Sequence, residues 1–221
     1  LTVDPPRHTK YRRLVDKAFT PKRVSDMGPE IEKKTNFIID QFFDDGKCEV
    51  ASQLAQPLPI RVIAEALGAS TDDYEFFRIS SEAFTDQLSG TSTPEEHIEI
   101  AKKLVKFQQY FAERLNEKEK NPTDDILSDL ATLEFEDEDG VLRKMETPEQ
   151  LSIIQQLLVA GNATTAHSIT EAIKLLIENP DQMELVVNDH SLIPNMIEES
   201  LRLLTPTNNM WRIATEDTEL G

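Results

Sequence analysis

Cysteine and basic residues are scarce in this chain of 221 residues. The one cysteine, Cys48, excludes an internal disulfide and fits a reducing compartment. Lysine and arginine total 23 against 41 acidic residues, a net charge of −18, which argues against nucleic acid as a partner. The chain starts without a secretory signal pattern. We therefore expect a cytoplasmic protein.

Charge is also missing from one long stretch. Residues 151–170 contain no charged side chain, although 29% of the chain is Asp, Glu, Lys or Arg. The stretch is long enough to span a bilayer, but Gln155, Gln156, Asn162 and His167 make it too polar for lipid. Its apolar residues recur at helical spacing. We interpret it as a buried helix of a soluble protein, with no membrane contact.

The hydrophobic periodicity and the turn residues predict a mainly α fold. A long central helix is expected at about 147–179, begun by the capping box Thr147-Pro148-Glu149-Gln150. Other helices are expected at about 7–19, 24–43, 59–67, 94–120, 124–133, 180–188 and 192–204, with one more after Thr71. Short strands are expected at 48–50, 210–214 and 219–220, and an acidic loop at 134–144.

The centre of the predicted long helix has an unusual composition. The run Ala160-Gly161-Asn162-Ala163-Thr164-Thr165 places poor helix formers where a helix interior is expected. Glycine alone costs about 1 kcal/mol relative to alanine there. One interpretation is a helix crossing that needs small side chains, and the other is a place where something packs or reacts. The run by itself leaves both open.

Positive charge gathers near the start of the chain. Residues 1–23 contain seven basic side chains and two acidic ones. His8 and Arg12 are four residues apart, so they share one helix face. The paired donors of arginine and the positive end of a helix suit a carboxylate or a phosphate. The alternative is a basic surface helix that pairs with the protein's own acids.

Two further arginines have ambiguous surroundings. Glu199 and Arg202 have the spacing of an ion pair within one helix, either on the surface or buried among apolar neighbours. Arg212 alternates with apolar residues in a predicted strand, and it faces either solvent or a buried anion.

These features, in this order, resemble the cytochrome P-450 family in its soluble bacterial form. Asp4-Pro5-Pro6-Arg7-His8-Thr9-Lys10-Tyr11-Arg12-Arg13-Leu14 resembles the start of the haem-facing helix, and the 160–165 run resembles the oxygen-groove motif. Glu199-Ser200-Leu201-Arg202 is similar to the Glu-any-any-Arg signature. Trp211-Arg212-Ile213-Ala214-Thr215-Glu216-Asp217 resembles the strand with another haem-contacting arginine. The resemblance implies one partial domain, residues 1–221, of a mainly α fold with small β-sheets, incomplete at both ends.

The resemblance also assigns roles to residues. His8, Arg12 and Arg212 match positions that bind the propionates of haem b, iron protoporphyrin IX. Ala160 and Gly161 match positions beside the haem, where the helix backbone opens at Gly161. Thr164 matches the hydroxyl that hydrogen-bonds dioxygen and helps to deliver protons for O–O cleavage.

Other roles follow from the same resemblance. Glu199 and Arg202 match a structural pair that holds the segment beneath the haem. Candidate substrate-binding residues are Ala160, Thr164, Thr207, Asn208 and Asn209, with Phe84 and Leu88 as further candidates from an overhanging helix.

The chain departs from the family pattern in two respects. The acid that usually precedes the catalytic threonine is Ala163 here, so water and Asn162 are candidates to replace it in proton delivery. The cysteine loop that ligates the iron is also missing, and the axial cysteine is expected beyond Gly221. Cys48 is interpreted as an ordinary buried or half-buried thiol. The chain as given is therefore expected to contain no metal ligand and to be inactive by itself.

The resemblance implies a haem-dependent monooxygenase. It would use dioxygen to oxidise a small, moderately apolar organic substrate, with electrons passed from NAD(P)H through a ferredoxin-type partner. A fungal branch of the family that reduces nitric oxide with a nicotinamide donor has a similar Ala-Gly-Asn-Ala-Thr run, and is the alternative reaction. A non-catalytic acidic helical interaction module, or a degenerate homologue, is the alternative of another class.

Overall fold

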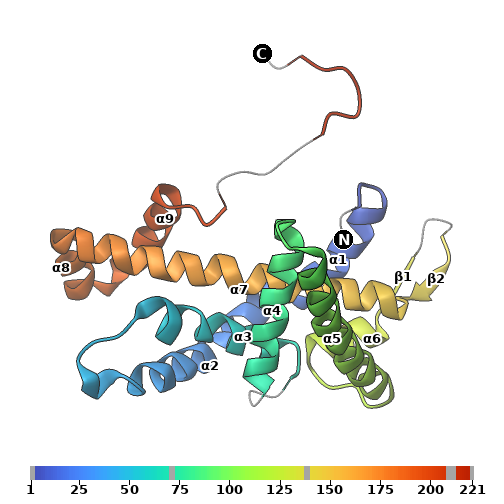
Figure 1. Cartoon of the computed structure of the whole chain (residues 1–221), viewed down its shortest axis with the longest axis horizontal. Helices are drawn as coiled ribbons and strands as arrows, with labels where there is room; N and C mark the ends of the chain where they lie inside the picture. Colours follow the sequence, from blue (N-terminus) through green and yellow to red (C-terminus); the bar gives the residue numbers. More distant parts are fainter. Residues whose placement is uncertain (1–2, 70–72, 137–139, 208–212, 220–221) are drawn as a thin grey trace. The chain divides into compact units, whose positions relative to one another are not determined.

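The computed structural model describes residues 3–69, 73–136, 140–207 and 213–219, without the side chains of Arg7, Lys17 and Ala18. The described part is mainly helical, as predicted (Figure 1). Its helices are α1 (Arg7–Ala18), α2 (Pro21–Asp40), α3 (Pro57–Ala66), α4 (Tyr74–Ser89), α5 (Pro94–Lys120), α6 (Ile126–Thr132), α7 (Thr147–Glu178), α8 (Pro180–Asn188) and α9 (Ile193–Leu203). Its strands are β1 (Glu134–Glu136) and β2 (Leu142–Lys144).

The chain divides into two compact units, Leu1–Ala163 and Thr164–Gly221. The division falls within α7, which is itself one α-helix of 32 residues and confirms the predicted long central helix. The two units are described separately below. That they belong to a single domain stays a prediction.

Side-chain caps fix where helices begin in the first unit. At α5 the Thr93 hydroxyl accepts from the backbone N–H of Glu96, whose carboxylate accepts from the N–H of Thr93. At α6 the Asp125 carboxylate accepts from the N–H of Ser128 at 2.8 Å. Sequence-local hydrogen bonds of this kind explain why most helix positions could be predicted.

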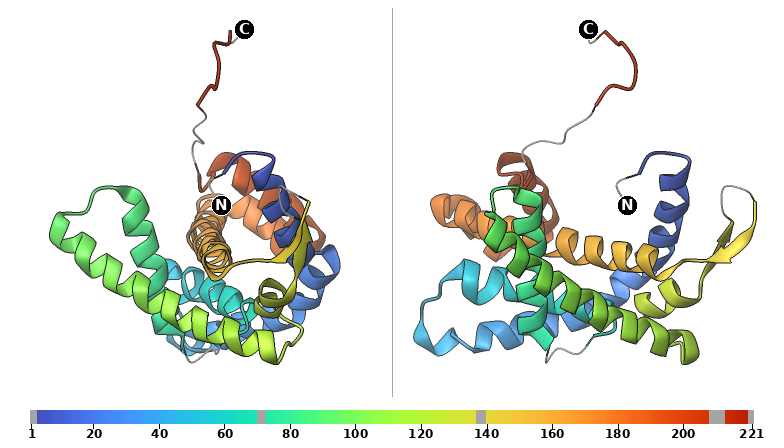
Figure 2. Two further views of the ribbon diagram at one scale, coloured as in Figure 1. Left: turned by 90° about the vertical axis from the view of Figure 1, so that its right-hand side faces the viewer. Right: turned by 45° about the vertical axis from the view of Figure 1, so that its right-hand side comes forward.

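An aromatic cluster forms much of the core between α4 and α5, which lie side by side (Figures 1 and 2). Phe84 meets Phe107 edge to face at 5.0 Å between ring centres, and Phe107 lies 4.8 Å from Phe111. Phe77 completes the cluster at 5.9 Å from Phe111. All four rings are at most 1% exposed, so they fix α4 firmly on α5.

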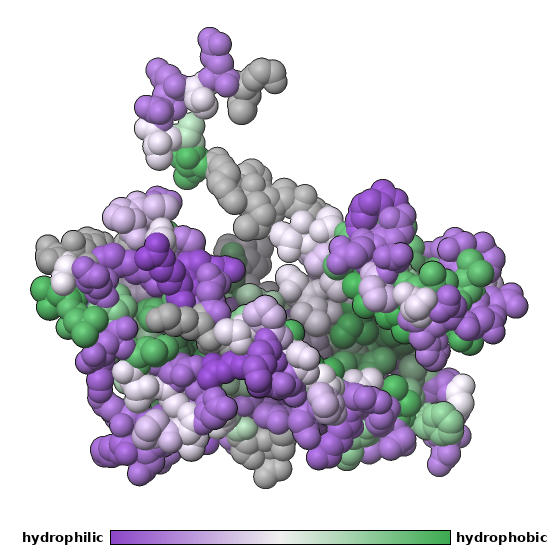
Figure 3. Space-filling view, turned by 180° about the vertical axis from the view of Figure 1, so that it is seen from behind, coloured by the Kyte–Doolittle hydropathy of each residue, from purple (hydrophilic) through white to green (hydrophobic). Residues whose placement is uncertain are grey.

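The surface is largely polar. Hydrophilic residues cover most of the face in Figure 3. Within the described ranges, no helix combines the length and the apolar character that crossing a membrane requires.

The acidic loop predicted at 134–144 is wrong, because the segment contains an antiparallel β-hairpin. Glu134 pairs with Lys144, and Phe135 with Arg143. Opposite charges across the strands favour this register. The three-residue strands carry mostly charged side chains, so they lack the apolar alternation that sequence analysis looks for.

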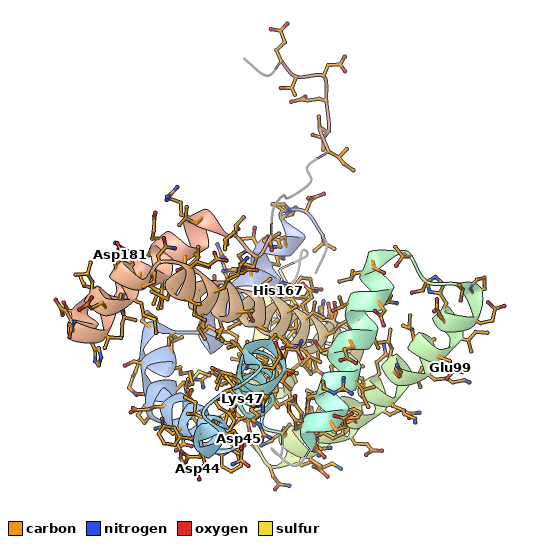
Figure 4. All side chains as sticks on the ribbon, turned by 60° about the vertical axis from the view of Figure 1, so that its left-hand side comes forward. Asp44, Asp45, Lys47, Glu99, His167 and Asp181 are labelled. Atoms are coloured by element: carbon orange, nitrogen blue, oxygen red, sulfur yellow. The ribbon has the colours of Figure 1, made fainter. Side chains whose placement is uncertain are left out.

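The strand predicted at 48–50 is also wrong. Glu49 instead caps a helical turn, Ala51–Ala55, because its carboxylate accepts from the N–H of Ser52 at 2.6 Å. Cys48 is exposed rather than buried or half-buried. It follows the turn that contains Asp44 and Asp45, directly after Lys47 (Figure 4). The predicted strand at 210–214 lies mostly outside the described residues, and Ile213 and Ala214 are not in a strand.

The cap of α7 is shifted by one residue from the prediction. The Glu149 carboxylate, and not that of Gln150, turns back to accept from a backbone N–H, that of Glu146, at 2.7 Å. The side chain of Gln150 is buried, and its amide donates to the carbonyl oxygen of Leu130 at 3.0 Å.

The Glu149 side chain is held in the capping position because it also forms hydrogen bonds with two residues from other elements. The Arg143 guanidinium of β2 donates to both its carboxylate oxygens, at 2.7 and 2.8 Å. The Tyr11 hydroxyl of α1 donates to the same carboxylate. The Arg143 guanidinium also lies over the Phe135 ring. One carboxylate therefore joins α1, the hairpin and the start of α7.

We expect this cluster to make stability depend on pH. The Arg143 guanidinium lowers the pKa of Glu149 to about 2, so the ionised carboxylate stabilises the fold above its unfolded pKa of 4.5. That stabilisation is lost as the pH falls from about 5 towards 2. Urea unfolding should show that Glu149→Gln removes roughly 2–3 kcal/mol at pH 7 and much less at pH 3.

Glu32→Gln is the control, because Glu32 is exposed on α2 and the described residues give it no ion pair. A loss for Glu149→Gln that is the same at both pH values would contradict the assignment.

Candidate functional site

The first part of the predicted anion site lies on α1. His8 is half-buried and Arg12 is exposed, one helical turn apart. The Arg12 guanidinium contacts only a solvated acid in the described ion pairs, Asp16 at 2.9 Å, and such a pair contributes little. Tyr11 and Leu14 are buried beside this face, and they fix the orientation of α1. In the structure Arg12 pairs with an acid of the chain itself, and donation by both side chains to an external anion stays a prediction.

The rest of the predicted anion and substrate contacts cannot be placed. Arg212, Asn208 and Asn209 lie outside the described residues, and Thr207 is exposed. The convergence of His8, Arg12 and Arg212 on one ligand stays a prediction.

The centre of α7 stays α-helical through the 160–165 run. Residues four apart lie on one side of a helix, so Ala160 and Thr164 share a side. Asn162 lies roughly 200° around the axis from each of them, on the opposite side. Ala160 is exposed and Thr164 is half-buried. The helix therefore presents a small, uncharged face on the side of Thr164.

Gly161 marks a close crossing with α3. A Cβ atom placed on Gly161 would lie 3.5 Å from the Ile63 side chain, which is ordinary van der Waals contact. α7 therefore crosses α3 on this side, but the crossing does not require a glycine. The interpretation that something packs or reacts at the run concerns the side with Ala160 and Thr164, so the two are compatible.

Asn162 points to α4. Its side-chain amide donates to the Ser81 hydroxyl at 2.7 Å, while its amide oxygen is buried without a partner among the described residues. Sequence analysis missed this contact, because no local pattern joins residues that are 81 positions apart.

The second unit has an apolar groove of about 460 Å³ between α7 and α9. Its walls are formed by Thr164, Thr165, Ser168, Ile169, Ala172, Ile197, Ser200, Leu201, Leu204 and Pro206. Sequence analysis had named Thr164 but missed the α9 wall. The signal was present, because Ile197, Leu201 and Leu204 form an apolar stripe at helical spacing.

Glu199 and Arg202 form the predicted ion pair on α9. The guanidinium donates to both carboxylate oxygens, at 2.5 and 2.7 Å. This contact lowers the pKa of Glu199. Both side chains are exposed, so in this chain the pair is a surface contact of small energetic weight.

The two further substrate-binding candidates on α4 differ in burial. Phe84 is buried in the aromatic cluster, whereas Leu88 is exposed on the same helix. His167 is exposed on α7 (Figure 4). Across the parts of the chain that the structure describes, no three His, Cys, Asp or Glu side chains gather as metal ligands would.

Comparison with known proteins identifies the family. The sequence profile of cytochrome P450 matches residues 74–221, and the chain therefore belongs to the cytochrome P450 family. The chain is 37% identical over 218 residues to cytochrome P450 CYP107DY1 of Priestia megaterium, covering 98% of this chain and 51% of that protein. It is 36% identical over 222 residues to the 6-deoxyerythronolide B hydroxylase of Saccharopolyspora erythraea, covering 100% and 52%.

The fold agrees with this assignment. The structure of P450BioI in complex with an acyl carrier protein ligated to hexadec-9Z-enoic acid matches with a TM-score of 0.89 and 28% identity, covering 100% of this chain and 55% of that one. The chain thus spans about half the length of the relatives it matches.

The contact at Gly161 predicts that this position tolerates a larger side chain. We expect Gly161→Ala to raise the free energy of unfolding by up to about 1 kcal/mol, because alanine is the better helix former and its Cβ fits against Ile63. Gly68→Ala is the opposite case, because Gly68 has a φ of +67° and the new Cβ would lie 2.9 Å from the Asp125 carboxylate.

Urea unfolding of both variants measures the contrast, with a loss of about 1–2 kcal/mol expected for Gly68→Ala. A loss of stability for Gly161→Ala as well would mean that α3 and α7 approach too closely for any side chain.

Proposed function

We propose that the full-length protein containing this chain is a haem-dependent monooxygenase that oxidises a small, moderately apolar organic substrate. The observation that carries the proposal is the family match over residues 74–221, which includes the Thr164 motif of α7 and the Glu199–Arg202 pair of α9. The name of one relative, 6-deoxyerythronolide B hydroxylase, describes the same class of reaction.

The donors on α1 suit the propionates of haem b. Carboxylates favour a guanidinium and an imidazole, and Arg12 and His8 offer both from one fixed helix face. With Arg212 they would hold the haem, while the small residues Ala160 and Gly161 leave room beside α7. Haem with a cysteine thiolate ligand supplies the activation of dioxygen, and we propose that this cysteine lies outside these 221 residues.

On this proposal, Thr164 acts on oxygen through its hydroxyl. It would donate a hydrogen bond to dioxygen and pass on a proton, which is general acid catalysis by a positioned group. The apolar groove beside Thr164 would then contribute one wall for substrate, together with Ala160, Thr207, Asn208 and Asn209. Its lining suits an apolar molecule rather than a charged one.

We propose that electrons come from NAD(P)H through an acidic ferredoxin-type partner that docks on the basic segment around α1. Arg13 is exposed there, next to Arg12 in sequence. Complementary charge of this kind speeds encounter more than it strengthens binding.

Spectroscopy of the full-length protein tests the haem assignment. We expect a reduced, carbon-monoxide-bound absorption spectrum typical of thiolate-ligated haem. Arg12→Ala should weaken haem retention at least about tenfold, because one charge-assisted hydrogen bond is lost. Arg13→Ala is the matched neighbour, and should keep the haem but slow reduction by the partner, with a weaker dependence on salt. Absence of any bound haem would refute the proposed function and favour a non-catalytic module.

The assigned role of Thr164 predicts uncoupling. Thr164→Ala in the full-length protein should lower product formed per NAD(P)H by about tenfold and release peroxide, because proton delivery becomes unselective. Thr165→Ala, in the next and more exposed position, should leave this ratio near that of the wild type. Equal ratios for the wild type and Thr164→Ala would remove Thr164 from the mechanism.

A second reaction is favoured by one residue. Ala163 stands where the resemblance to the family leads us to expect an acid. The run is similar to that of a fungal branch that reduces nitric oxide. On this alternative, the protein would consume nitric oxide with NAD(P)H directly, without a ferredoxin and without oxygenated product. Assays of both reactions on one preparation distinguish them.

A further inference from the structure

We propose that Asn162 is a positioning residue that ties the centre of α7 to α4 through Ser81, and that it does not itself pass protons. The inference rests on the proposed function for its kinetic consequences. The contact itself is independent of any bound group.

The contact joins the two helices inside the core of the first unit. The Asn162 amide donates to the Ser81 hydroxyl at 2.7 Å, and Ser81 is only 2% exposed. Phe77 and Phe84, four residues before and three after Ser81, lie on the same side of α4 and pack on α5. The Ser81 side chain is therefore in the core, and losing its partner leaves a buried polar group unpaired.

The second half of the amide strengthens this assignment. The Asn162 amide oxygen is inaccessible to solvent and has no partner among the described residues. Exchanging the amide nitrogen and oxygen does not remove the problem, because one of the two atoms still faces no partner. The unpaired atom costs free energy, so the bond to Ser81 is the interaction that offsets the burial of this amide, and that bond joins α4 to α7.

Helix geometry excludes a direct role beside Thr164. Two residues along α7 correspond to a rotation of roughly 200°, so the Asn162 side chain leaves the helix on the opposite side from the Thr164 hydroxyl. Asn162 can thus influence Thr164 only by holding the helix in place. This distinguishes it from the acid that Ala163 replaces.

A double-mutant cycle on the full-length protein tests the contact. Ser81→Ala and Asn162→Ala are each expected to lower the folding equilibrium constant, and the double variant should lose roughly three- to tenfold less than the product of the two single effects. Ser80→Ala is the matched control. Ser80 is 1% exposed on the same helix, but its hydroxyl donates to the Phe76 carbonyl at 2.7 Å. The combined loss in the folding equilibrium constant for Ser80→Ala and Asn162→Ala should therefore equal the product of the two single losses.

A kinetic readout separates positioning from proton transfer. Both Ser81→Ala and Asn162→Ala should lower product formed per NAD(P)H to the same level, with the double variant no worse and the solvent isotope effect unchanged. Ser80→Ala should keep the wild-type ratio. The proposal would be overturned if the effects of Ser81→Ala and Asn162→Ala on stability were independent. It would also be overturned if Asn162→Ala lowered product formed per NAD(P)H while Ser81→Ala kept the wild-type value. The stability cycle needs no activity, so its outcome is separate from that of the proposed function.

Discussion

The carboxylate of Glu149 is the interaction on which the arrangement of the first unit depends. It caps α7, receives both donors of Arg143, and accepts the Tyr11 hydroxyl. Tyr11 lies on α1 between His8 and Arg12 in sequence. Its hydrogen bond to Glu149 therefore also fixes the orientation of the helix face that contains His8 and Arg12. Because α1 is short and opens with no capping side chain, its own hydrogen bonds do not fix it. The hydrogen bond from Tyr11 to Glu149 holds the helix that the proposed haem contacts require.

The weak helix formers at the centre of α7 differ in the contacts they make. Gly161 faces Ile63 across the crossing with α3, where an alanine would also fit, and Asn162 bonds to Ser81. Ala160 and Thr164 lie on the remaining side, where the helix is partly uncovered. One turn of helix thus contacts two neighbours, and its third side is the one that the proposed function assigns to a ligand. The absence of charge over residues 151–170 follows, because two of the three sides are occupied by protein.

Sequence alone predicted what depends on local patterns. Capping residues and apolar periodicity located the long helix and most of the others, and the one-turn spacing placed His8 and Arg12 together. The cap of α7 was misplaced by one residue, since Thr147 with Gln150 and Glu146 with Glu149 have the same spacing. Partners outside the helix, Arg143 and Tyr11, favour Glu149. The Asn162–Ser81 bond was also missed because it joins residues far apart in the sequence, and no local pattern around either residue predicts the other.

The exchange of an acid for Ala163 limits how protons can reach Thr164 under the proposed function. Asn162 is on the wrong side of the helix, and its amide is held by Ser81. The Ser168 hydroxyl, one turn on, donates to the Thr164 carbonyl at 2.9 Å and is committed to the backbone. The side chains around Thr164 in α7 therefore offer no second acid to relay a proton. Under the proposed function, we therefore expect water that reaches the exposed side of the helix at Ala160 to supply protons to Thr164.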